Sequence, residues 1–121
     1  MIAQCLVNIA SHPMVEEIII CDDASADIAE LRKQVRLCRE KLPNRILLIE
    51  NKENVGSFHN KVRAVGHCTK GWVVLLDSDN ILDYSYLERL KTLLHNAQCV
   101  FLPDTAFPQF KFELPKGITS I

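Results

Sequence analysis

The sequence predicts an α/β protein with a mostly parallel sheet and helices on both faces. Short apolar runs alternate with amphipathic segments along the chain, and this alternation implies right-handed crossovers between parallel strands. The apolar runs contain few polar residues, as expected for strands buried on both faces. The 121 residues are 48% hydrophobic, enough for one packed core. We therefore expect a single domain over residues 1–121, with a tail at 103–121.

The first part of the chain predicts a strand, a helix and a second strand. Residues 16–21 contain three consecutive isoleucines, and residues 45–50 contain four consecutive apolar residues. Short apolar runs of this kind indicate buried strands. Between them, residues 26–42 place apolar side chains at alternating steps of three and four, the spacing of an amphipathic helix. We expect Ser25 to cap this helix and Pro43 to end it.

The second part of the chain continues the alternation. Residues 57–68 have apolar residues at helical spacing, and residues 72–76 form an apolar run that predicts a third strand. A further helix is expected from Asp83, its candidate cap, to about residue 96. Residues 99–102 predict a fourth strand, which Pro103 would stop.

Composition and charge exclude several classes of protein. The net charge is −1 and the basic residues are scattered, so we expect no nucleic-acid partner. No apolar stretch approaches the length of a transmembrane helix, and the first residues lack the layout of a signal peptide. The five cysteines are dispersed without a Cys-x-x-Cys pair, which favours a reducing, cytoplasmic location. The four histidines form no ligand cluster, and we expect each to be a surface or cap residue: His12, His59, His67 and His95.

An acidic pair follows the predicted third strand. Asp77 and Asp79 are two residues apart, and an extended chain points such residues to the same side. Two carboxylates suit Mg²⁺ or Mn²⁺, which waters and substrate phosphates usually complete. An isolated Asp-x-Asp is more often a solvated acidic turn, so other segments must support the metal hypothesis.

Two more polar segments follow strands at the same predicted edge of the sheet. Residues 21–27 hold three aspartates, and residues 51–57 lead through Gly56 into a helix. Open α/β sheets bind ligands beyond the carboxyl ends of their strands. A helix start suits an anion, and Lys61, one turn later, would neutralise a phosphate. The simpler alternatives are a polar loop in which Ser25 or Asp27 caps the next helix, a tight glycine turn and a solvated lysine.

Together these segments resemble the nucleotide-binding half of family 2 glycosyltransferases, over roughly residues 2–102. The family pattern Asp-Asp-Gly-Ser-x-Asp has Ala24 in place of its glycine here. The remaining patterns, in order, are Asn-x-Gly, a helical Ala-Arg-Asn-x-Gly that matches only loosely, and an apolar strand ending in Asp-x-Asp-Asp. They correspond to 54–56, 60–64 and 71–80.

The resemblance implies a Rossmann-like GT-A fold that binds a UDP- or GDP-sugar with Mn²⁺ or Mg²⁺. By analogy, Asp22 or Asp23 would contact the base and Asp77 the ribose. Asp77 and Asp79 would hold the metal that bridges the diphosphate. The same resemblance assigns five more residues to the nucleotide sugar: Ser25, Asn54, Gly56, Lys61 and Ser78. Lys61 stands where the family has arginine, and Asn80 replaces the last aspartate.

The family pattern has two further parts that this sequence does not match: a strand at its beginning and an acceptor half at its end. Residues 1–9 match the helix that follows that first strand. We therefore expect an incomplete glycosyltransferase, inactive on its own. Its exposed strand edges would be covered by direct pairing of 16–21 with 72–76, by the tail, or by a second copy. The tail alternates Phe110, Phe112 and Leu114 with polar residues, and we expect a homo-oligomer.

Two other functions compete with the glycosyltransferase hypothesis. One is a non-catalytic nucleotide-binding or interaction module of α/β type. The other is a phospho-acceptor domain of the response-regulator type, which also carries an acidic pair at a strand end. The latter requires a lysine at a later strand end, and the sequence offers none there.

Overall fold

The computed structural model describes residues 2–42, 45–94, 105–106 and 110–111. The chain divides into two units, Met1–Tyr84 and Ser85–Ile121, and each is described by itself. No helix among these residues is long and apolar enough to cross a membrane.

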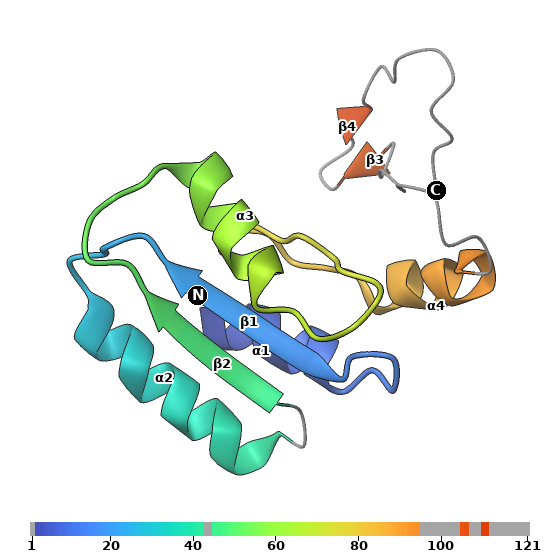
Figure 1. Ribbon diagram of the computed structural model, residues 1–121. Coiled ribbons are helices and arrows are strands. Elements are labelled where there is room, and N and C mark those ends of the chain that lie inside the picture. Colours follow the sequence, from blue (N-terminus) through green and yellow to red (C-terminus); the bar gives the residue numbers. More distant parts are fainter. Residues whose placement is uncertain (1, 43–44, 95–104, 107–109, 112–121) are drawn as a thin grey trace. The chain divides into compact units, whose positions relative to one another are not determined.

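The first unit is α/β, as predicted, with one pair of parallel strands and helices on both faces (Figure 1). Its elements are α1 (Ile2–Ala10), β1 (Glu17–Asp22), α2 (Ile28–Lys41), β2 (Arg45–Glu50) and α3 (Ser57–Gly66). β1 and β2 pair in parallel, in a register that runs from Glu17 opposite Arg45 to Asp22 opposite Glu50. Their parallel direction requires the crossover that α2 provides. The predicted strands at 16–21 and 45–50 and the two helices that follow them are therefore confirmed.

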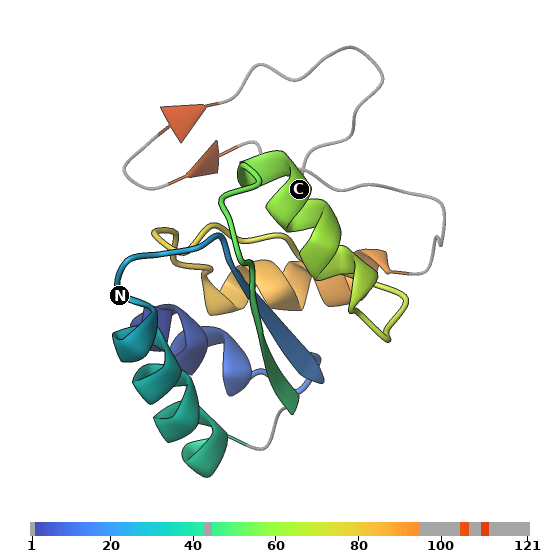
Figure 2. The ribbon, with the colours of Figure 1, turned by 60° about the vertical axis from the view of Figure 1, so that its left-hand side comes forward.

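The core lies on one face of this sheet. α1 and α2 cover that face and α3 lies on the other (Figure 2). Ile18 and Ile20 of β1 point into the core, because residues two apart share a face. The buried cluster consists of Leu6, Ala10, Ile18, Ile20, Val35, Cys38 and Ile46. α3 has no buried residue, so the face that it covers is more open to solvent.

The predicted third strand at 72–76 is wrong. This segment has no regular secondary structure, and its residues 72–75 are exposed, Leu75 to 56%. A strand needs a hydrogen-bonded neighbour, and in the described residues β1 pairs with β2 alone. Direct pairing of 72–76 with β1 is therefore absent from the described structure as well. Apolar composition identified a segment able to form a strand but not the partner that it requires.

Two local predictions also fail. Asp27, not Ser25, is the N-cap of α2, and no side chain caps the helix. His12 was expected at the surface but is only 1% exposed. Its ring lies against Tyr84, with ring centroids 4.5 Å apart, and its Nδ1 accepts a hydrogen bond from the Met14 N–H at 3.2 Å. The polar edge of this imidazole is satisfied locally, which allows it to be buried.

The second unit contains most of α4 (Tyr84–Leu93), with β3 (Thr105–Ala106) and β4 (Phe110–Lys111). The predicted helix from Asp83 is confirmed, although it is shorter than expected. β3 and β4 pair antiparallel, with Ala106 opposite Phe110. The expected extended tail is thus confirmed at Phe110, in a hairpin with a neighbouring segment. Several predicted features lie outside the described residues: Pro43, His95, the strand at 99–102, Pro103, Phe112 and Leu114.

The core predicts a clear difference between two positions of α2. Val35 is 1% exposed and belongs to the buried cluster, whereas Leu37 is 45% exposed. Val35→Ala should lower the free energy of unfolding by about 2 kcal/mol, because it removes buried methyl groups and leaves a cavity. Leu37→Ala should change it by less than about 0.5 kcal/mol. Urea denaturation measures both, and equal losses would contradict this assignment of the core.

Candidate functional site

The carboxyl ends of β1 and β2 meet at one edge of the sheet. The ladder continues one step beyond the strands, because the Asn51 N–H donates to the Asp22 carbonyl at 2.9 Å. Asp22 ends β1 at this edge and Asp23 follows it, and residues 51–56 form the loop from β2 to α3. The structure therefore brings together two of the three predicted polar segments.

The Asp23 carboxylate joins these two segments. Its Oδ1 accepts hydrogen bonds from the Val55 N–H at 2.8 Å and from Asn51 Nδ2 at 2.9 Å. Its Oδ2 accepts the Gly56 N–H at 2.9 Å. Gly56 has φ +84°, in the left-handed region where residues with a side chain are strained. Asn54 Oδ1 also accepts from the Gly56 N–H, at 3.1 Å. The glycine, Asn54 and Asp23 together fix the turn that leads into α3.

These hydrogen bonds also stabilise the ionised form of Asp23. The N–H of Val55 foremost, then Asn51 Nδ2 and the N–H of Gly56, hold the pKa of the Asp23 carboxyl below its ordinary value. Asp23 is only half-buried, so partial desolvation does not outweigh its donors. The edge thus carries a fixed negative charge at neutral pH.

The neighbouring Asp22 carboxylate has different hydrogen-bond partners from those of Asp23. It is buried, and its Oδ2 accepts the Ser25 N–H at 3.0 Å while its Oδ1 accepts the Ser25 hydroxyl. Between them Ala24 has φ +62°. This is the position where the resemblance expects glycine, the residue that adopts such a φ without steric cost. The loop therefore keeps the turn that the family pattern encodes while carrying a less suitable residue.

A network of amide and guanidinium groups attaches α3 to this edge, and the sequence analysis missed it. Asn51, which is 7% exposed, donates to Asn60 Oδ1 at 2.9 Å and accepts from Arg63 Nη1 at 3.0 Å. Asn60 Nδ2 in turn donates to the Cys21 carbonyl at 2.8 Å. The available signal was the pair Asn60 and Arg63, polar residues three apart and therefore on one side of the helix.

The acidic loop at 77–80 is the third polar segment. It does not follow a strand, but two contacts hold it. The Cys5 thiol of α1 donates to the Asn80 carbonyl at 3.0 Å and to the Ser78 carbonyl at 3.5 Å. Lys61 Nζ of α3 lies 2.7 Å from Asp77 Oδ1. Asp79 is exposed and makes no hydrogen bond or ion pair within the described part of the chain.

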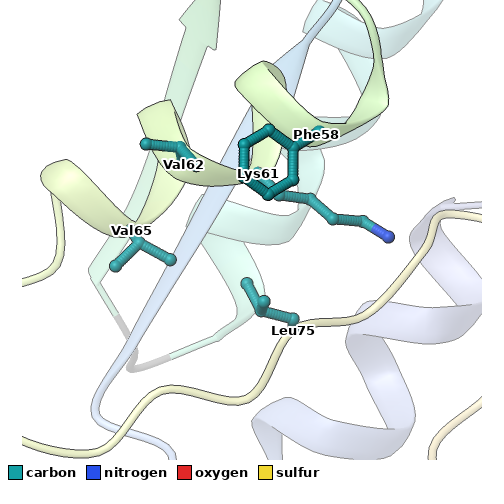
Figure 3. Close-up of a pocket in the computed structure, with 5 residues that line it drawn as sticks. All are labelled: Phe58, Lys61, Val62, Val65 and Leu75. Atoms are coloured by element: carbon teal, nitrogen blue, oxygen red, sulfur yellow. The ribbon is translucent and has the colours of Figure 1, made fainter.

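An apolar hollow lies beside Lys61 (Figure 3). It has a volume of about 220 Å³, and Phe58, Lys61, Val62 and Val65 of α3 line it together with Leu75. The Lys61 ammonium points out of the hollow, away from the apolar side chains (Figure 3). Leu75 therefore places the chain segment along α3, and two residues later Asp77 meets Lys61.

The side chains that could ligate a metal in this region permit one kind of metal site. No group of three His, Cys, Asp or Glu side chains among the described residues could hold a metal by itself. Asp77 and Asp79 nevertheless supply hard oxygen donors, and Mg²⁺ is commonly held by one or two carboxylates with substrate phosphates and waters. The two carboxylates therefore fit a divalent cation whose remaining positions waters or substrate phosphates complete, and do not fit a preformed metal cage.

Comparison with known proteins identifies the family. The model of glycosyl transferase family 2 matches residues 1–111. The match covers most of the 121 residues, so the chain belongs to this family, as its motifs indicated. No curated protein and no solved structure matches the chain.

The Asp23 contacts predict a pH dependence. Because the pKa of Asp23 is lowered on folding, its contribution to stability is complete above the unfolded-state pKa of about 3.9 and is lost as the pH falls through the lower folded value. The free energy of unfolding of the parent should therefore decrease more steeply below about pH 5 than that of Asp23→Asn. Denaturant titrations from pH 7 to pH 3 measure the difference.

A matched control separates Asp23 from other carboxylates. Glu17 and Glu50 also have lowered pKa values, through hydrogen bonds from Thr69 and Arg32 respectively, and both remain in the variant. Asp27→Asn removes an exposed carboxylate that forms no cap hydrogen bond and should retain the profile of the parent. Identical profiles for the parent and Asp23→Asn would refute the role given to Asp23.

Proposed function

We propose that this chain binds a nucleoside-diphosphate sugar, of UDP or GDP type, at the edge formed by residues 22–25, 51–56 and 77–80. The observation that supports this most is the connection of the three segments. Asp23 bonds to Val55 and Gly56, and Lys61 on the following helix pairs with Asp77. Family membership supplies the ligand class, and the connected edge supplies a place where one ligand could reach all three segments.

In this proposal Asp23, rather than the buried Asp22, contacts the base. Asp23 Oδ1 accepts two hydrogen bonds, whereas Oδ2 accepts one. A carboxylate oxygen has two lone pairs, so Oδ2 can accept one more N–H, such as that of a pyrimidine or purine ring. Asp77 lies near the ribose. Ser25, Asn54, Gly56, Lys61 and Ser78 line the rest of the donor.

The proposed cofactor is Mn²⁺ or Mg²⁺, held by Asp79 with Asp77. When bound, such an ion stabilises the negative charge that develops on the departing nucleoside diphosphate. The exposure of Asp79 supports this role, because a carboxylate without a protein partner is available to a ligand. The four described cysteines are free thiols, which supports a reducing location such as the cytoplasm.

We also propose that these 121 residues bind the donor without transferring the sugar. Transfer requires a positioned acceptor and a general base, and the described residues assigned to the proposed site have roles only in binding the donor and the metal. The alternative is a non-catalytic nucleotide-binding module. Asp22, Asp23 and Asn51 support it equally well, since they order the loops through hydrogen bonds within the protein. The two differ in their metal requirement, which only the glycosyltransferase proposal predicts.

A homo-oligomer is the proposed assembly. Its support is an exposed apolar surface on α3 and the segment after it: Phe58, Val62, Val65, Trp72, Val73, Val74 and Leu75. Exposed apolar patches commonly mark interaction surfaces. Light scattering should give a molar mass of at least two copies for the parent, and a lower mass for Phe58→Ser. Val7→Ser, which changes an exposed side chain of α1, should keep the mass of the parent. A monomeric parent would refute this assembly.

The metal role predicts the effect of one isosteric change. Asp79→Asn should weaken Mn²⁺-dependent UDP binding by at least about tenfold, because a neutral amide oxygen is a poorer metal ligand than a carboxylate. Its melting temperature should stay near that of the parent, since Asp79 is exposed. Calorimetric titration with UDP and Mn²⁺ makes the measurement. The control Glu40→Gln removes an exposed charge from α2 and should bind as the parent does. Equal affinity in Asp79→Asn would exclude Asp79 from the site.

A further inference from the structure

We infer that Lys61 changes its ionic partner when the donor and the metal bind. Its ammonium leaves the Asp77 carboxylate and pairs with the donor diphosphate, and the divalent cation binds that carboxylate instead. This inference rests on the proposed donor-binding function. The observation that carries it is the ion pair at 2.7 Å between Lys61 Nζ and Asp77 Oδ1. The same carboxylate is a proposed metal ligand, so the ammonium and the metal compete for it.

The strength of the pair suits an exchange. The Lys61 and Asp77 side chains are 41% and 52% exposed, and ion pairs so accessible to water contribute little stability. A divalent cation on Asp77 repels a nearby ammonium, and the pair is too weak to resist it. In this structure Lys61 pairs with Asp77, and each group neutralises the other.

The surroundings of Lys61 define where its ammonium moves. Its aliphatic stem lies among the apolar side chains of the hollow, with the charged head outside (Figure 3). A lysine stem of this kind stays packed while the head changes partner. Ser57 begins the same helix one turn earlier, and the N–H groups of a helix start favour a phosphate nearby. A diphosphate bound there is a strong anion within reach of the released ammonium.

The exchange predicts opposite effects of one substitution on two ligands. Lys61→Met keeps the apolar stem and removes the charge. Without nucleotide it should bind Mn²⁺ about threefold more tightly than the parent, because the competitor for Asp77 is gone. At saturating Mn²⁺ it should bind UDP about threefold more weakly, because the diphosphate loses its cation. Uridine, which has no phosphate, should bind both proteins equally.

Two controls distinguish exchange from a general change in charge. Lys70→Met removes an equal charge from a similarly exposed pair, Lys70 with Glu16 at 2.5 Å, and should leave both affinities unchanged. In an Asp77→Asn background, Lys61→Met should no longer increase Mn²⁺ affinity, because the contested carboxylate is absent. Titration calorimetry on the full chain measures every arm.

The outcomes separate this inference from the proposed function. A gain in Mn²⁺ affinity that persists in the Asp77→Asn background, or that Lys70→Met reproduces, would overturn the exchange. Equal affinities of the parent and Lys61→Met for Mn²⁺ and for UDP would also overturn the exchange. The proposed donor binding would still stand in that case, because the parent binds both ligands. A parent that binds neither ligand would overturn both.

Discussion

Three hydrogen bonds to one carboxylate hold together the edge of the sheet where β1 and β2 end. Asp23 follows β1, and its oxygens accept from the backbone of Val55 and Gly56 and from the Asn51 amide. Parallel strands bring loops to a common edge but do not fix their conformation. Here a charged acceptor fixes the loop before α3, and the helix starts where that loop places it. The position of Lys61, and through it of Asp77, depends on this attachment.

The attachment of α3 is polar where an ordinary helix would use an apolar stripe. Asn60 and Arg63 bond to the ends of β1 and β2, whereas Phe58 and Val62 remain exposed. A helix held in this way keeps its position while much of its apolar surface stays in solvent. This explains how one molecule combines an ordered polar edge with an apolar hollow beside it. It also places the charged pair of Lys61 and Asp77 next to the surface proposed for self-association.

The sequence predicted those parts of the structure that depend on local pattern. The isoleucine run of β1 and the three-four spacing of α2 predicted the correct elements, because a short apolar run and a helical spacing of apolar residues are both local signals. The segment 72–76 was misassigned, because a strand also needs a partner that composition cannot reveal. Asn51 was missed for a related reason: its contacts join residues far apart in the chain, and nothing near it marks burial. The sequence placed Asp23 and Gly56 in loops that follow two predicted strands, and the structure adds the hydrogen bond that joins them.

The central claim is that three separate segments form one donor site, and amide chemical-shift mapping tests it most directly. UDP with Mn²⁺ is titrated into ¹⁵N-labelled protein. The account predicts that the amide signals of residues 22–26, 54–57 and 77–80 shift during the titration and give the same dissociation constant. It predicts no shift at the opposite edge, where Thr69 and Lys70 contact the start of β1. Shifts confined to one segment, or centred on that opposite edge, would contradict a single site built from the three segments.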